Sequence, residues 1–295
     1  MPNEKKDLVF RIDGETGEIV SQFEIGEGES LTSSEKFHKR KIFMEKKNDF
    51  ENLKEISDEI GGFCFLYYKK SEILYKDEGI SKSNISRLIY LATFIDYETN
   101  EIVDYKSNGK KYSLGLKDIK ALLKLSEKTF NEFFKEMIER EIIHKQNENF
   151  FISKKYFSKG KLSKNENSFT RMFIQTIRDL YEATSSRQHK QLANVFSLVP
   201  FLDYETNAIV GEDGEKLKLT EIARLLGYDE TNVTRMKKDL LGFSIVKNNT
   251  KFYFFCFVKL ETIENETNFF MVNPLAFYAG SSESTFRTLV RLTRM

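Results

Sequence analysis

The chain of 295 residues is long enough for two or three domains, and its 46 Lys and Arg against 45 Asp and Glu leave a net charge of only +1. This balance excludes a bulk polycation, so any binding to nucleic acid must come from local basic patches. Two cysteines, Cys64 and Cys256, lie in apolar runs typical of buried thiols; they exclude a disulfide or zinc framework and favour a reducing cytoplasm. We also expect no membrane helix and no signal peptide, because no long apolar run is present and the first residues are polar.

Residues 1–62 are expected to form an N-terminal extension of the chain. Apolar residues alternate over 8–23 around Asp and Gly turn residues, which predicts a β-hairpin. The run at 36–47 is basic, and both a phosphate-contacting arm and a solvated helix face fit it. Apolar spacing over 50–60 predicts a helix that ends at the two following glycines.

Residues 63–160 contain a pair of helices, predicted at 116–124 and 126–140, followed by two short strands around a QNEN turn. On the second helix, Lys128 and Asn131 are the residues best suited to contact DNA. Four Glu residues on the same helix would repel phosphates. A weak DNA-binding role and a structural or protein-binding role therefore both fit this domain.

Residues 161–184 are expected to form a linker. Cations outnumber acids throughout 154–190, and an apolar stripe over 168–182 predicts an amphipathic helix that turns its cations outward. Such a helix would contact phosphates between the two flanking domains. The cations expected to make these contacts are Lys161, Lys164, Arg171 and Arg178.

Residues 185–280 contain a second pair of helices, within 219–246, whose apolar spacing fits two short helices packed across each other. The second of these helices, predicted at 229–241, turns outward a polar and basic face of the kind that reads base edges and phosphates. A polar turn, KNNTK, follows it and ends at Lys251, which is placed to contact phosphate. The helix residues expected to contact DNA are Thr231, Asn232, Thr234, Arg235 and Lys238.

The two domains are copies of one another. FIDYETNEIV recurs as FLDYETNAIV, and the apolar positions of the two helix pairs coincide when 115–143 is aligned with 218–246. The copies also end alike, in FFISKKYFSKG and FFMVNPLAFYAG. A repeat of about a hundred residues indicates duplicated domains rather than a solenoid. We therefore expect an α+β chain, mainly helical, with two tandem winged helix-turn-helix domains and a basic helical tail at 281–295.

The second copy resembles a known family. Its DYETN turn, the stretch LTEIARLLGYDETNVTRMKKDLL and the closing MVNPLAFYAG are similar to the winged-helix replication proteins of low-GC Gram-positive plasmids and phages, the replication protein L family. The first copy is less similar, because ISKKYFSKG lacks the Asn-Pro pair. The duplication is also similar to the tandem winged-helix initiators of iteron plasmids, in architecture only. The resemblance implies binding to double-stranded DNA on a mobile element.

Two classes of function remain, because signals for catalysis are poor: the three histidines are isolated, and GKL at 160–162 is not part of a P-loop. We expect no enzyme, metal site or cofactor. The first class is a sequence-specific DNA-binding protein in replication initiation or transcription control. The second is an adaptor whose first domain binds a protein. The expected partners are double-stranded DNA, a host or phage replication or transcription protein, and a second copy of this chain; the expected location is the cytoplasm, with the nucleoid.

Overall fold

The computed structural model describes residues 7–12, 19–25, 44, 61–67, 80–160, 162, 168–247, 249–261 and 266–293. The chain divides into two compact units, Met1–Asn48 and Asp49–Met295.

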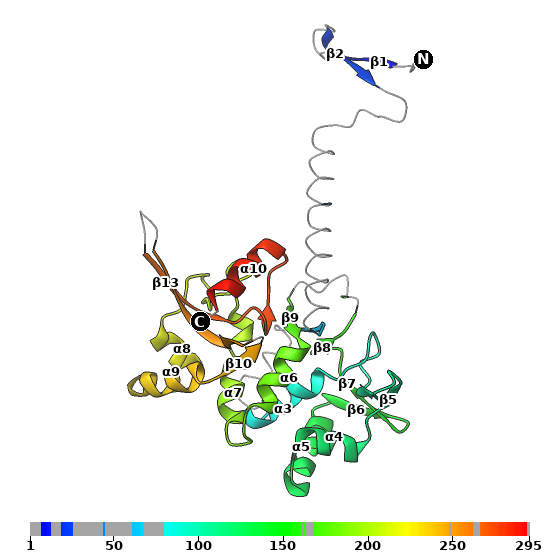
Figure 1. Ribbon diagram of the computed structural model, residues 1–295, viewed down its shortest axis with the longest axis vertical. Helices are drawn as coiled ribbons and strands as arrows, with labels where there is room; N and C mark the ends of the chain where they lie inside the picture. The colour runs from blue at the N-terminus through cyan, green and yellow to red at the C-terminus, as the bar shows by residue number, and fades with distance from the viewer. Residues whose placement is uncertain are drawn as a thin grey trace. The chain divides into compact units, whose positions relative to one another are not determined.

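The first unit contains the hairpin that the sequence predicts. β1 (Asp7–Ile12) pairs antiparallel with β2 (Ile19–Ile25), which confirms the hairpin expected over 8–23 (Figure 1). The basic run at 36–47, apart from residue 44, lies outside the described residues, as does the helix expected over 50–60.

Both copies of the repeat lie in the second unit, Asp49–Met295. The first copy contains the expected helix pair, followed by a two-stranded sheet (Figure 1). Serine side chains cap two of its helices: Ser81 accepts a hydrogen bond from the backbone of Asn84, and Ser126 accepts one from that of Thr129. The elements of this copy are β3 (Phe63–Leu66), α3 (Lys82–Ala92), β4 (Val103–Tyr105), β5 (Lys111–Ser113), α4 (Leu116–Leu123), α5 (Glu127–Glu139), β6 (Ile143–Gln146), β7 (Asn149–Ile152) and β8 (Phe157–Ser158).

Like the first copy, the second has an opening strand, a helix pair, a hairpin after this pair and a closing strand. Among the described residues it differs in having a helix, α6, after its opening strand, a single β-bridge in place of β4–β5, and a further hairpin, β12–β13. The extended segment after the KNNTK turn is interrupted at Phe254, whose backbone N–H donates to the carbonyl of Phe243, so this segment forms two separate strands. The helix expected in the tail is confirmed as α10. The elements of this copy are β9 (Thr170–Phe173), α6 (Ile174–Glu182), α7 (His189–Phe196), η1 (Val199–Phe201), α8 (Leu219–Leu225), η2 (Glu230–Asn232), α9 (Val233–Leu241), β10 (Ser244–Lys247), β11 (Thr250–Tyr253), β12 (Phe255–Glu261), β13 (Glu266–Val272), β14 (Phe277–Tyr278) and α10 (Glu283–Leu292).

One four-stranded antiparallel sheet joins the two copies. Its strand order is β14–β9–β3–β8, so the opening strands of the copies pair at the centre and their closing strands lie outside. Phe63 pairs with Phe173 and Leu66 with Thr170, a register in which aligned positions of the copies lie symmetrically. A two-fold axis between the copies would produce this arrangement. The linker helix expected over 168–182 is therefore wrong in its first part, which is a central strand of this sheet.

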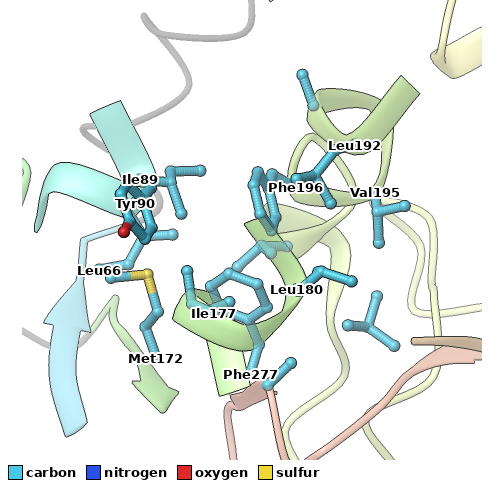
Figure 2. Close-up of a cluster of buried hydrophobic side chains, with 14 of the residues drawn as sticks. Leu66, Ile89, Tyr90, Met172, Ile177, Leu180, Leu192, Val195, Phe196 and Phe277 are labelled. Carbon is cyan, nitrogen blue, oxygen red and sulfur yellow. The ribbon is translucent and has the colours of Figure 1, made fainter. Parts of the chain in front are cut away.

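The hydrophobic core is continuous across the two copies. α3 packs against α7, its counterpart in the second copy, and also against α6. Figure 2 shows the side chains that meet there, all of them buried: Leu66, Ile89 and Tyr90 from the first copy, and Met172, Ile177, Leu180, Leu192, Val195, Phe196 and Phe277 from the second. Since burying apolar surface contributes about 25 cal/mol per Å² to stability, the two copies stabilise each other.

The DYETN motif that both copies share has a structural role. Its asparagines, Asn100 and Asn207, are buried with φ angles of 63° and 55°, a left-handed conformation that asparagine tolerates better than most residues. The Asn207 amide donates to the carbonyl oxygens of Val272 and Phe277, at 2.7 and 2.9 Å. Asn100 makes an equivalent pair of bonds in the first copy. The motif thus anchors the closing strands of each copy.

The expected fold class, mainly helical with two tandem winged-helix domains, is wrong. In the described residues the helices alternate with several small antiparallel sheets, and one of these sheets belongs to both copies. The protein is α+β, but it is not clearly mainly helical. Hydrophobic spacing located the helix pairs, but it could not reveal strands whose partners lie about a hundred residues away.

Candidate nucleic-acid interface

Helices α8 and α9 pack across each other as their apolar spacing predicts. Ile222 and Ala223 of α8 and Met236 and Leu240 of α9 are all fully buried. The small side chain of Ala223 lets the helices approach closely. Gly227 forms the turn between them with a φ of 74°, a conformation that costs glycine little. One face of α9 is thereby fixed against the core, and its opposite face is left to solvent.

The start of α9 is shaped by Asp229. Its carboxylate accepts hydrogen bonds from the Thr231 backbone N–H at 2.8 Å and from Thr231 Oγ1 at 2.6 Å, and these bonds lower the pKa of Asp229. Residues 230–232 consequently form the 3-10 turn η2, and α9 proper begins at Val233. The helix expected over 229–241 is therefore shorter than predicted. The hydroxyl proton of Thr231 is also engaged, so Thr231 can offer DNA only its methyl group and its lone pairs.

The outward face of α9 carries polar and basic side chains. Its exposed residues beyond Thr231 are Asn232, Thr234, Arg235, Lys237 and Lys238. Lys237 was not expected from the sequence, although the apolar period of α9 leaves it outside the buried stripe. Among the described residues, Arg235, Lys237 and Lys238 form no ion pair, so the charges of these three side chains are available to an anion.

The β10–β11 hairpin follows α9 directly. Lys251 is exposed and pairs across the hairpin with Val246, whose side chain is 67% exposed. The Lys251 ammonium lies 4.7 Å from the centre of the Tyr253 ring, a cation–π contact. The hairpin therefore presents a cation beside an exposed apolar side chain.

The corresponding helix of the first copy, α5, has a different surface. Lys128 and Asn131 are exposed, as DNA contacts would have to be. Lys120 forms an ion pair with Glu127 and lowers the pKa of this carboxyl, and Asn131 hydrogen-bonds to it as well. The exposed acids on α5 are Glu127, Glu132 and Glu139. α5 is thus more acidic than α9, and Asn131 already has a partner.

Two of the expected phosphate contacts are instead structural, which corrects the prediction of an outward-facing linker. Arg171 lies in β9, is only 3% exposed, and donates to the carbonyl of Gly280. Arg178 of α6 donates to Thr93 Oγ1 at 3.0 Å and to the Thr93 carbonyl at 2.9 Å, and its guanidinium lies 3.7 Å from the centre of the Phe94 ring. Burial lowers the pKa of both arginines. Lys161 and Lys164 lie outside the described residues.

Arg178 donates its hydrogen bonds to the C-terminal end of a helix rather than to a phosphate. Thr93 is the C-terminal cap of α3, where backbone carbonyls have no partner within the helix and where a positive charge is favourable. Apolar periodicity alone could not identify this role, because the partner of Arg178 belongs to the other copy.

Three potentially reactive side chains are buried. Burial raises the pKa of Cys64 and that of Cys256 to about 12, which confirms both as buried thiols. Burial also lowers the pKa of His189 to about 4, and its ring stacks on Tyr181 at a centroid distance of 4.3 Å. Near neutral pH the two thiols are protonated and the imidazole is uncharged.

Within the described part of the chain, no helix is both long and apolar enough to cross a bilayer. The same residues contain no group of three or more His, Cys, Asp or Glu side chains that could hold a metal ion. Comparisons of the chain with protein-family models, with curated proteins and with solved structures found no match. The resemblance of the second copy to plasmid and phage replication proteins therefore stays a prediction.

Proposed function

We propose that this protein binds double-stranded DNA sequence-specifically, with α9 in the major groove and the β10–β11 hairpin against the backbone. The observation that supports the proposal is the surface of α9, where Arg235, Lys237 and Lys238 are exposed and form no ion pair within the described part of the chain, while the opposite face is buried. A helix held in this way can enter a groove about 12 Å wide and place its side chains on base edges.

The chemistry of the outward side chains supports this proposal. Arginine can bond bidentately to guanine and asparagine to adenine, so Arg235 and Asn232 are suited to base edges. Lysines act as point charges and suit phosphates, which is the role proposed for Lys237, Lys238 and Lys251. The proposal includes a place for the protein in the cytoplasm, with the nucleoid, and a role in replication initiation or transcription control of a phage or plasmid. It assigns no catalytic step and no cofactor.

A matched pair of double variants tests the proposal. Lys237→Ala with Lys238→Ala removes two cations from α9, and Lys128→Ala with Lys135→Ala removes the same charge from α5. Each lost phosphate contact should lower the slope of log affinity against log salt by about 0.9. We expect this decrease for the α9 variant and much less change for the α5 variant. Equal decreases would show that net charge, rather than α9, determines binding.

A second function is favoured by the surface of the first copy. Beside the acidic face of α5, the side chain of Ile138 is 39% exposed. An open hollow of about 440 Å³ lies next to it, lined by Ile138, Glu141, Ile143, His144 and Lys145. An apolar side chain among acids suits a protein partner better than a phosphate backbone. In this alternative the first copy binds a host or phage replication or transcription protein, or a second copy of this chain. Two results together would favour this alternative. The wild-type protein would bind every duplex weakly, whatever its sequence, and Ile138→Asp would abolish the binding of a protein partner.

A further inference from the structure

A chain of hydrogen bonds connects the first copy with both helices of the α8–α9 pair. Lys82, in the first turn of α3, donates to the carbonyl of Leu226 at 2.9 Å and to Asn194 Oδ1 at 2.8 Å. Asn194 Nδ2 donates to Tyr228 Oη at 2.8 Å, and Tyr228 Oη donates to Asp239 Oδ2 at 3.2 Å. The chain thus runs from α3 through α7 to the turn after α8, and then to α9.

Two of its members are costly to remove. Leu226 caps the C-terminus of α8, where a carbonyl lacks a helical partner and an ammonium group is favourable. Lys82 supplies this ammonium from a half-buried position, where burial lowers its pKa. Asn194 is only 4% exposed and bonds through both ends of its amide. Loss of either side chain would leave buried polar groups without partners.

No equivalent connection reaches the first copy among the described residues. In the alignment of the copies, His189 takes the place of Lys82, and its Nδ1 is buried without a hydrogen-bond partner among the described residues. A cavity of about 40 Å³ remains beside the turn after α4, lined in part by Leu123, Lys124 and His189. In the second copy the Lys82 ammonium bonds to the corresponding turn.

The carboxylate that aligns with Asp239 is Glu136 of α5, and it too is held by a hydrogen bond. Its donor is Asn84 Nδ2, at 2.6 Å. Asn84 belongs to the same copy as α5. Asp239 is also bonded from within its own copy, by Tyr228, but the network behind Tyr228 begins at Lys82 in the other copy. The protein therefore provides an internal control: within the described residues, α5 is bonded by a residue of its own copy alone, whereas α9 is bonded through a network that begins in the other copy.

We propose that Lys82 and Asn194 are positioning residues that set the orientation of α9 and so determine its sequence preference. The inference rests on the proposed DNA binding. Reading bases requires side chains held to within about 0.5 Å, whereas attraction to phosphates tolerates larger displacements. An α9 released from this network keeps its three cations. It therefore loses discrimination between sequences while keeping its general affinity for DNA.

The test compares full-length variants on a preferred duplex and on an unrelated duplex of equal length. Lys82→Met keeps the length of the side chain but removes the ammonium. It should weaken binding to the preferred duplex on the order of tenfold, the effect of one lost charged hydrogen bond, with little change on the unrelated duplex. Lys82→Arg keeps a cation at this position and should restore most of the preference. Glu136→Gln, which weakens the tie within the first copy, should leave the preference intact.

A second measurement requires no DNA. Amide hydrogen exchange in α9 should speed up in Lys82→Met, while exchange in α5 stays as in the wild type. Tyr228→Phe removes only the hydroxyl from the network and keeps the ring. It should lower the sequence preference and speed up exchange in α9, as Lys82→Met does, and it provides this test even if variants of Asn194 fail to fold.

The outcomes separate the two proposals. Equal weakening on both duplexes in Lys82→Met, or an unchanged preference together with unchanged exchange in α9, would overturn the positioning role and leave DNA binding intact. A wild-type protein that prefers no duplex in a random pool would overturn the DNA-binding proposal itself, and the positioning role with it.

Discussion

Arg235 is the residue on which sequence recognition should depend most. It lies in the first turn of α9, is exposed, and has a guanidinium that suits a guanine edge. Arg235→Ala should weaken binding to the preferred site by about 1–3 kcal/mol and relax the preference at one base pair. Competition binding against a set of singly substituted duplexes measures both effects. Glu132→Ala, at the aligned position of α5, is the control and should change neither. If Arg235→Ala weakens binding equally on every duplex, Arg235 contacts a phosphate.

His189 should make stability depend on pH. Burial lowers the pKa of its imidazole to about 4 from an ordinary value of 6.5, and the charge of Arg87 adds to this shift. Below about pH 6.5 the unfolded chain therefore binds a proton that the folded protein excludes, so the free energy of unfolding falls as the pH drops towards 4. In His189→Gln this contribution should disappear. Urea unfolding of both proteins at about pH 7 and pH 5 measures the difference, and an identical pH dependence would contradict a depressed pKa.

The roles of single residues are the hardest feature to predict from the sequence. The DYETN asparagines contributed to the resemblance with DNA-binding replication proteins, yet their amides hold the closing strands of each copy. Arg178 looked like an outward cation because its partner, Thr93, is distant in the sequence. The polar face of α9 was predictable, since a helix with a clear apolar stripe leaves the remaining positions exposed.

At the scale of elements, α9 and α5 share a position in the repeat but differ in surface. The cations of α9 have no ion pairs among the described residues, whereas on α5 Lys135 lies 3.6 Å from Glu139 and Asn131 is engaged by Glu127. α9 should therefore dominate base recognition.

The double variant Lys128→Ala with Asn131→Ala tests this asymmetry in the full-length protein. Surface substitutions that break no important contact change free energies by about 0.5 kcal/mol or less each, so two of them should change the affinity for the preferred site by no more than about fivefold. The corresponding double variant of α9, Asn232→Ala with Arg235→Ala, should lose most of the preference for this site over unrelated duplexes. A loss of preference of similar size in both double variants would mean that the two helices read DNA equally.

Helix pairs were predictable from the sequence because each needs only local periodicity. The central strand β9 was not, because its apolar residues also fit one face of a helix, and the pairing with β3 decides between the two structures. The 3-10 turn at the start of α9 depends on the carboxylate of Asp229 and could not be read from spacing either.

At the scale of the molecule, the described copies share one sheet and one core, so they should unfold together. Met172 is fully buried in β9 and pairs with Cys64 of β3. Met172→Ala should lower the free energy of unfolding by about 2–5 kcal/mol, as large-to-small core substitutions do. Urea unfolding followed by amide protection in α5 and in α9 should show both midpoints falling together. Val246→Ala, at an exposed position, is the control; a shift confined to one helix would show that the copies unfold independently.

Selection from a random duplex pool decides whether this protein recognises a DNA sequence through α9. The full-length protein should enrich one sequence pattern and bind it about 10³-fold or more tightly than unrelated duplexes. Arg235→Ala should enrich the same pattern with one base pair relaxed, because only one contact is lost. A pool that stays random after repeated rounds, or an identical pattern enriched by wild type and Arg235→Ala, would contradict sequence recognition through α9.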